Sequence, residues 1–147
     1  MKRPAFGLMA ILTGLFLNIA AVLPVQADET KSLYERLGGR PAIAAVVDGM
    51  VENIAADERI AWRFDKTDFA SYKPTFVDFV CMVTGGPCDY QGLSMPNAHS
   101  RMGISNEEFD ITVGHVLAVL DKLGVPAREK AELTMLVGTL RTSVVEQ

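Results

Sequence analysis

Apolar side chains recur every three or four residues through most of this chain, in segments separated by glycine and proline. This spacing is typical of helices that bury one face, and no two segments alternate apolar and polar residues as paired strands would. We therefore predict an all-α fold. The expected helices cover residues 31–37, 41–56, 68–83, 105–123 and 127–145.

Capping signals mark several of the expected helix ends. Ser105 and Glu108 form a capping box, Asp68 suits an N-cap, and Gly38 suits a left-handed C-terminal cap. Pro74 conflicts with the helix that Asp68 would start, because an internal proline removes a backbone donor and clashes with the preceding turn. We expect that helix to have a loose or kinked first turn, or to begin one residue before the proline.

The apolar face of each helix defines the predicted core. Residues 85–97 contain Gly, Pro and Ser at short intervals, so we expect little regular structure there and only a turn or two of helix before His99. The core positions are Ile43, Val47, Met50, Val51, Ile54, Phe69, Tyr72, Thr75, Phe76, Phe79, Val80, Val83, Phe109, Val113, Val116, Leu117, Leu120, Leu133, Leu136, Val137, Leu140 and Val144.

The first 27 residues differ from the rest. Lys2 and Arg3 precede an apolar run over residues 6–23, and a small-residue site ends at Ala27. This is the pattern of a secretory signal peptide, so we expect residues 28–147 to form one exported domain, periplasmic or secreted, without stable membrane insertion. The alternative is an uncleaved N-terminal membrane anchor, because the run approaches the roughly 20 residues that span a bilayer.

Charge and cysteine content narrow the function classes. Cleavage would leave 12 Lys and Arg against 18 Asp and Glu, a balance that disfavours nucleic-acid binding. Cys81 and Cys88 flank a Gly-Gly-Pro turn, and in an oxidising compartment a disulfide between them would contribute about 2 to 3 kcal/mol. The alternative is a pair of reduced, partly buried thiols. Their spacing is not the Cys-X-X-Cys arrangement of redox-active pairs.

His99 is one of only two histidines and stands just before a predicted helix start, among apolar, aromatic and methionine-bearing faces. No second histidine or cysteine group is arranged to complete a tetrahedral metal site. These features favour a haem iron held by His99, and the alternative is a solvated histidine at a helix end. A Cys-X-X-Cys-His motif is absent, so the haem would be non-covalent haem b.

Several motifs occur together in the order found in one family. They are Leu37-Gly38-Gly39, Thr84-Gly85-Gly86-Pro87, Tyr90-Gln91-Gly92 followed by Met95, His99 and Gly103-Ile104, and Val113-Gly114-His115. Over residues 32–145 the chain resembles the group I truncated haemoglobins. The resemblance implies a truncated globin fold, a helical sandwich around a haem pocket, with His99 as the proximal ligand. His115 matches a position that is not an iron ligand, so we expect it to make a hydrogen bond in the core or at the surface.

The resemblance also implies the walls of the pocket. Phe64 matches the phenylalanine that wedges against the haem, and further walls are Phe76, Phe79, Val80, Met95, Ile104 and Phe109; each could equally be an ordinary core residue. Lys73 and Arg101 are candidates to pair with the haem propionates, with solvated charges as the alternative.

The distal side departs from the family pattern. Met50 and Val51 stand where the family commonly has Phe-Tyr, and Phe76 stands at a position that is often Gln. Val51 and Phe76 cannot donate a hydrogen bond to bound O2, so O2 should leave faster. Tyr72 is the first candidate donor and Thr75 a shorter one, although the Tyr72 hydroxyl could instead lie in water.

The expected function is reversible binding of O2, with NO or CO as further ligands, at a five-coordinate iron for transport, storage or sensing. The first alternative is a haem enzyme such as an NO dioxygenase or weak peroxidase. It ranks second because it needs an unidentified electron donor, and no flavin or nicotinamide domain is present. The second alternative is a haem-free helical interaction module.

Overall fold

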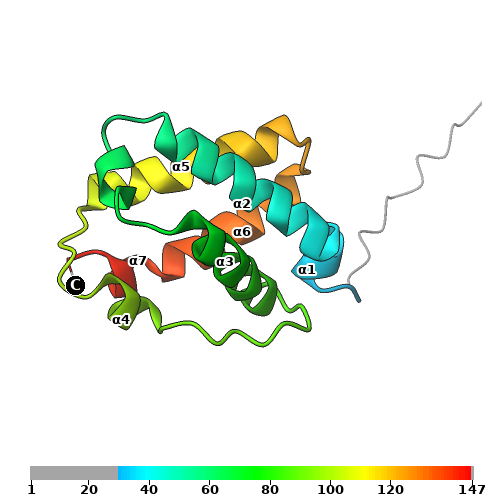
Figure 1. Cartoon of the computed structure of the whole chain (residues 1–147). Helices are drawn as coiled ribbons and strands as arrows, with labels where there is room; N and C mark the ends of the chain where they lie inside the picture. Colours follow the sequence, from blue (N-terminus) through cyan, green and yellow to red (C-terminus); the bar gives the residue numbers. More distant parts are fainter. Residues whose placement is uncertain (1–29, 147) are drawn as a thin grey trace, which may run out of the picture.

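Helices that cross in two layers build the fold (Figure 1). The computed structural model describes residues 30–146, and the predicted signal peptide lies outside them. The elements are α1 (Leu33–Arg36), α2 (Gly39–Ala55), the 3-10 helix η1 (Ala61–Phe64), α3 (Phe69–Val83), α4 (Met95–His99), α5 (Asn106–Lys122), α6 (Ala127–Thr139) and α7 (Arg141–Val144). Within residues 30–146 there is no strand, only an isolated bridge between Ile104 and Val145. The all-α prediction is confirmed.

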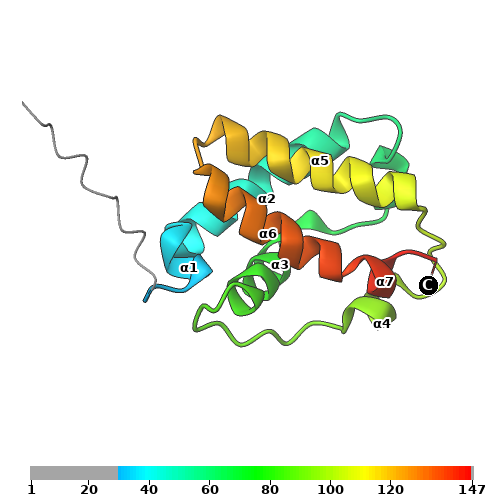
Figure 2. The same cartoon turned by 180° about the vertical axis from the view of Figure 1, so that it is seen from behind.

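α2 is the central helix, since it packs against both α3 and α5. Its predicted apolar positions are all buried. One end of α2 packs with Val77 and Cys81 of α3, and the other end forms a cluster with Ile60. A third cluster joins α1, α5 and α6. Figure 2, the view from behind, shows α5 and α6 in front of α2, with α6 leading to α7 beside α4.

The predicted helix caps are confirmed. The Asp68 carboxylate accepts a hydrogen bond from the Ala70 amide at 3.0 Å, and Ser105 with Glu108 forms a capping box. Gly38 is left-handed, with φ 98°. α3 begins at Phe69 and contains Pro74, so the alternative start near the proline was wrong.

The predicted last helix, residues 127–145, is two helices. The Thr139 hydroxyl donates to the Leu136 carbonyl at 2.6 Å, and the Leu140 amide donates to Val137 instead of Leu136. A side chain thus competes for the carbonyl that a continuous α-helix would use, and the helix ends there. α7 then turns to pack against α4.

The buried side of α3 also differs from the prediction. Thr75 is exposed, whereas Val77 and Cys81, one helical turn apart, are buried against α2. The aromatic side chains Tyr72 and Phe76 are only half-buried. α3 therefore uses its Val77 side to hold the fold together and leaves its aromatic side partly open.

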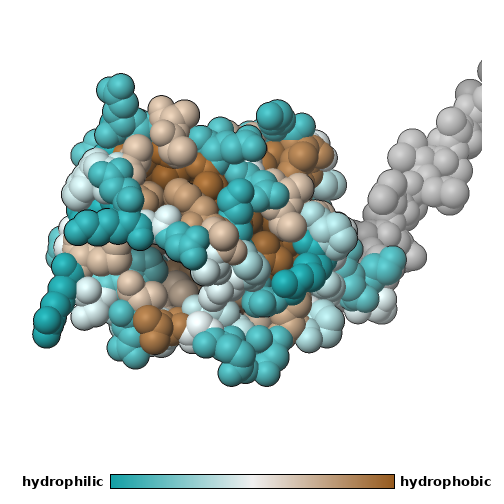
Figure 3. All heavy atoms as spheres, viewed as in Figure 1, coloured by the Kyte–Doolittle hydropathy of each residue, from teal (hydrophilic) through white to brown (hydrophobic). Residues whose placement is uncertain are grey.

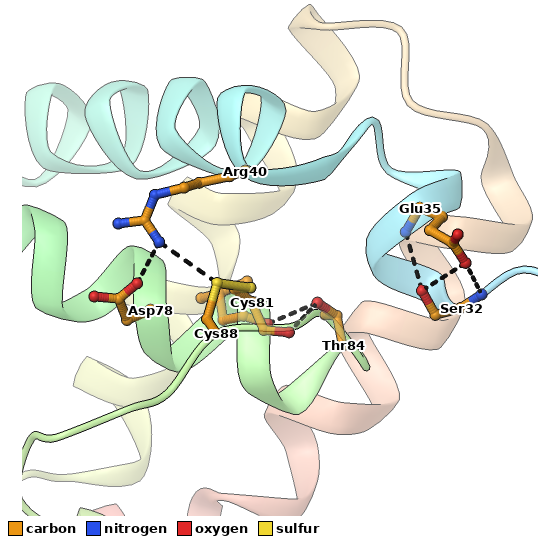
Figure 4. Close-up of a disulfide and its surroundings, with 8 residues drawn as sticks. Ser32, Glu35, Arg40, Asp78, Cys81, Thr84 and Cys88 are labelled. Carbon is orange, nitrogen blue, oxygen red and sulfur yellow. Dashed lines mark hydrogen bonds and ion pairs between the residues drawn. A yellow bond between two sulfur atoms is a disulfide. The ribbon is translucent and has the colours of Figure 1, made fainter.

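A disulfide joins Cys81 to Cys88 at the end of α3 (Figure 4). The Arg40 guanidinium of α2 lies beside it, paired with Asp78 and 3.4 Å from the Cys88 sulfur. The cross-link fixes the start of the irregular segment that leads to α4. The predicted disulfide is therefore present in the structure, and the alternative of two reduced thiols is not.

Gly86 lies inside this disulfide ring, and its replacement by alanine should destabilise the protein. An added Cβ would lie 2.6 Å from the Cys81 sulfur, which the disulfide holds in place, and 2.6 Å from the Tyr34 ring. We expect Gly86→Ala to lower the free energy of unfolding by about 1 to 3 kcal/mol in urea titrations. Gly114→Ala is the control, because its Cβ in α5 meets nothing within 4 Å and should stabilise by about 0.5 to 1 kcal/mol. Wild-type stability in Gly86→Ala would contradict the close approach.

The face in Figure 3 mixes hydrophilic and hydrophobic residues, and the hydrophobic ones lie in separate spots between hydrophilic ones. Among the described residues, no helix combines the length and apolar character that crossing a bilayer requires.

Candidate functional site

His99 is the last residue of α4 and is half-buried. Its Nδ1 lies 2.8 Å from the Met95 carbonyl oxygen. A carbonyl can only accept a hydrogen bond, so Nδ1 carries a proton, and the tautomer with this proton has its lone pair on Nε2. This hydrogen bond to the backbone fixes the tautomer and orientation that a metal-binding histidine needs.

α4 is supported by the end of the chain. It packs against α7, and the Glu146 amide donates to the Ile104 carbonyl at 2.9 Å. The Met102 amide donates to the His99 carbonyl at 3.1 Å. The short helix that carries His99 is therefore held by α7 on one side and by the turn at residues 99–102 that follows α4.

The predicted distal residues Val51, Tyr72 and Phe76 come together with the predicted wall residue Phe64 in one cluster, which we call the distal cluster. It is built on the buried side chains Met50, Val51, Ile54 and Ile60, with Phe64, Phe69, Tyr72, Phe76, Ile111 and Val116 packed against them. α2, η1, α3 and α5 each contribute. The cluster is thus an apolar surface whose aromatic rings are partly exposed.

Comparison with known proteins identifies the arrangement. The sequence model described as bacterial-like globin matches residues 32–146.

The chain belongs to the bacterial-like globin family.

Similar proteins of known class are group 1 truncated hemoglobins. The one from Tetrahymena pyriformis is 36% identical over 98 residues, which is 67% of this chain and 81% of the relative. The one from Mycolicibacterium paratuberculosis is 30% identical over 116 residues, or 79% and 85% of the two chains.

Solved structures agree with these relatives. The T. pyriformis truncated hemoglobin in its Fe(III) form matches with a TM-score of 0.77 at 32% identity, covering 80% of this chain and 100% of the other. The Synechococcus sp. 2/2 hemoglobin, in the cyanomet state with covalently attached heme, matches with a TM-score of 0.74 at 31% identity, covering 78% and 98%. The predicted truncated globin fold is confirmed.

Globins bind haem, and the residues of this globin fit that group. His99 presents one nitrogen lone pair. The aromatic side of α3 is partly open, and its rings are in contact: the centroids of Tyr72 and Phe76 are 5.5 Å apart, and those of Phe76 and Phe79 are 6.1 Å apart. Such a surface suits the flat, largely apolar macrocycle.

Tyr72 is the one residue of the predicted distal set with a hydroxyl-bearing ring, and this ring is half-buried. Its ring stands edge-on to Phe64 and Phe69, at 6.4 and 6.0 Å between centroids. Burial raises the pKa of Tyr72 to about 12. The phenol therefore stays protonated at neutral pH and keeps a hydrogen to donate.

Three predicted residues stand apart from the distal cluster. The exposed Thr75 donates its hydroxyl to the Ser71 carbonyl at 2.9 Å, so that hydrogen is already used within α3. Lys73 forms an ion pair with Asp48 at 2.8 Å. Phe109 is buried on α5, with the guanidinium of Arg141 4.4 Å from its ring centre.

The other predicted wall residues lie on several elements. Met95 and Ile104 are half-buried on either side of His99, and Phe79 is buried beside the Tyr90 ring at 5.3 Å. Val80 packs against the Ile43 cluster. Arg101 is exposed and left-handed, with φ 63°. Contact of these side chains with haem stays a prediction.

His115 has a different role from His99. Its Nε2 lies 2.9 Å from the Asp57 carboxylate, in agreement with the predicted hydrogen-bonding role. The Arg59 guanidinium, and then His115, hold the pKa of Asp57 well below its usual range. Within the described part of the chain, no three His, Cys, Asp or Glu side chains gather as a metal site.

Arg63 was missed by sequence reasoning. Its Nε and Nη2 donate to the Glu108 carboxylate at 2.8 and 2.9 Å, and its Nη1 donates to the Met102 carbonyl at 2.5 Å. Glu108 was recognised only as a capping residue. A single arginine carries no pattern that points to a partner 45 residues away.

The Arg63 pair should make stability depend on acid pH. Hydrogen bonds from Arg63 lower the pKa of Glu108 from 4.5 to about 2. A lowered carboxyl pKa stabilises the fold above the unfolded value, and this contribution is lost as pH falls toward the folded value. We expect the stability advantage of wild type over Glu108→Gln to shrink between pH 7 and pH 2 in urea titrations. Glu107→Gln keeps the Arg63 pair and is the control. An advantage that is the same at both pH values would contradict this.

Proposed function

We propose that this globin binds haem b non-covalently through His99 and reversibly binds O2 at the opposite face of the iron, with NO and CO as competing ligands. The observation that carries the proposal is the His99 ring, oriented by Met95 with one lone pair available. Bound haem would supply an iron centre to which diatomic gases bind.

In this proposal, different side chains contact the two faces of the haem. His99 would hold the haem from α4, while the distal cluster keeps water and large ligands away from the other face. Val51 and Phe76 offer no hydrogen bond there, and Tyr72 is the candidate donor. The O2 complex would then owe its polar stabilisation to a single hydroxyl.

We further propose that the chain is exported after cleavage near Ala27. The signal-like pattern of residues 1–27 and the Cys81–Cys88 disulfide support this, since such bonds persist in oxidising compartments. Mass spectrometry of the mature N-terminus would test it, and an intact Met1 in cell fractions would contradict it.

Absorption spectra of the purified mature protein test the gas-binding function. Protein made with ample haem should show a Soret band, a five-coordinate ferrous form and a distinct CO complex. Failure to take up haem would refute the proposal and favour the haem-free interaction module.

Mixing the O2 complex with NO separates reversible gas binding from enzyme function. One stoichiometric reaction is expected, whereas repeated turnover with a reductant would indicate an NO dioxygenase.

A further inference from the structure

The chain around His99 has little structure of its own. α4 has five residues, far fewer than the roughly 12 to 15 that make an isolated helix even marginally stable. Beyond it, Arg101 and Gly103 are both left-handed, with φ 63° and 56°. The position of His99 must therefore be set by contacts from other elements.

Arg63 reaches this segment from η1. Its Nη1 donates to the Met102 carbonyl at 2.5 Å and its Nη2 to the Gly103 carbonyl at 3.3 Å. The same guanidinium is bound to Glu108 by two further hydrogen bonds and lies 4.2 Å from the Trp62 ring centre. All three nitrogens of the group are engaged, and two of the contacts hold the backbone that follows His99.

The pair that anchors these contacts is shielded from water. The side chains of Arg63 and Glu108 are 18% and 17% exposed. Glu108 is itself fixed, because its carboxylate accepts the Ser105 amide at 2.8 Å in the cap of α5. A charged, bidentate contact in such a place is stronger than a surface ion pair. Lysine could not replace it, since an ammonium group lacks the planar fork.

η1 has a second connection to the site. Phe64, the residue after Arg63, packs in the distal cluster. One 3-10 helix therefore contacts the distal side through Phe64 and the chain beyond His99 through Arg63.

We propose that Arg63 is a positioning residue for His99. It fixes the backbone three and four residues after the ligand relative to the helix that carries Phe64, and so sets how firmly His99 is presented to the haem. The proposal rests on haem ligation by His99, whereas the restraint on residues 100–104 is a property of the chain itself.

Hydrogen exchange on the full chain, with and without haem, tests the restraint. The amides of Met102 and Ser105 report on this segment, because both donate hydrogen bonds there. In Arg63→Met they should exchange about 10- to 100-fold faster, as expected for losing hydrogen bonds to a charged group. Arg63→Lys keeps the charge and should still show most of this increase. Arg59→Met removes a nearby arginine that pairs with Asp57 instead, so it should leave these amides as in wild type.

Haem retention and the iron–histidine bond test the positioning. In loaded Arg63→Met, haem transfer to an excess of apoglobin should be about tenfold faster or more, and the iron–histidine stretching band in the resonance Raman spectrum should shift or broaden. Wild-type exchange and wild-type haem transfer in this variant would overturn the proposal. If Arg63→Met does not fold, Arg63→Lys and Glu108→Gln decide it by the same two measurements. A wild type that takes up no haem would refute the proposed function, while exchange in the haem-free chain would still decide whether Arg63 restrains the segment.

Discussion

Replacing His99 by glycine should abolish stable haem binding. His99 is the one histidine whose ring is oriented by a backbone carbonyl, through its 2.8 Å contact with Met95. Removing even a partner of a metal ligand commonly lowers metal affinity about 10- to 100-fold, so loss of the ligand itself should exceed this. The measurement is haem titration followed by the Soret band, with haem loss timed against an apoglobin acceptor.

Two companion experiments separate ligation from misfolding. Added imidazole should restore a five-coordinate spectrum to His99→Gly, because the deleted side chain leaves room for a free ring. His115→Gln should bind haem like wild type, since His115 is occupied with Asp57. An unchanged spectrum in His99→Gly, or haem loss in His115→Gln, would mean that the iron is held elsewhere.

Replacing Tyr72 by phenylalanine should speed O2 dissociation about 5- to 150-fold, which corresponds to about 1 to 3 kcal/mol for a hydrogen bond to a partly charged ligand. The reason is the composition of the distal cluster, where Val51 and Phe76 have no hydrogen to donate. The Thr75 hydroxyl already donates its hydrogen bond to the Ser71 carbonyl. The pKa of about 12 keeps the Tyr72 phenol protonated across the usual range of assays.

Stopped-flow displacement of O2 by CO measures this rate. Tyr34→Phe is the matched control, because Tyr34 packs against the Ile43 cluster instead of the distal cluster. Equal dissociation rates in wild type and Tyr72→Phe would show that Tyr72 does not hold the ligand. The O2 complex of this globin would then rely on exclusion of water alone.

The helices and their caps could be predicted because their signals are local. Asp68 and the Ser105–Glu108 pair act on amides within three residues, and apolar spacing marked the buried face of α2. The break at Thr139 could not be predicted, because a threonine hydroxyl binds its own helix in many places without ending it.

The candidate site also contains residues that could be predicted from the sequence and contacts that could not. His99 stood out by its scarcity and its place in the chain, and the resemblance to the family supplied Phe64, Tyr72 and Phe76. The ion pair between Lys73 and Asp48 depends on how α3 crosses α2, and the contact between Arg63 and Glu108 joins elements 45 residues apart. Single charges have no periodicity, so such partners become visible only in three dimensions.

The turn from α6 into α7 places residues 141–146 against the segment that carries His99. Val144 is buried, Val145 bridges to Ile104, and the Glu146 amide donates to the carbonyl of the same residue. A version of this globin shortened after Thr139 would keep every long helix and still lose the backing of α4. If His99 holds the haem as proposed, proteolytic cleavage after Thr139 would therefore weaken the support of the ligand's helix, although it removes no residue close to His99 in sequence.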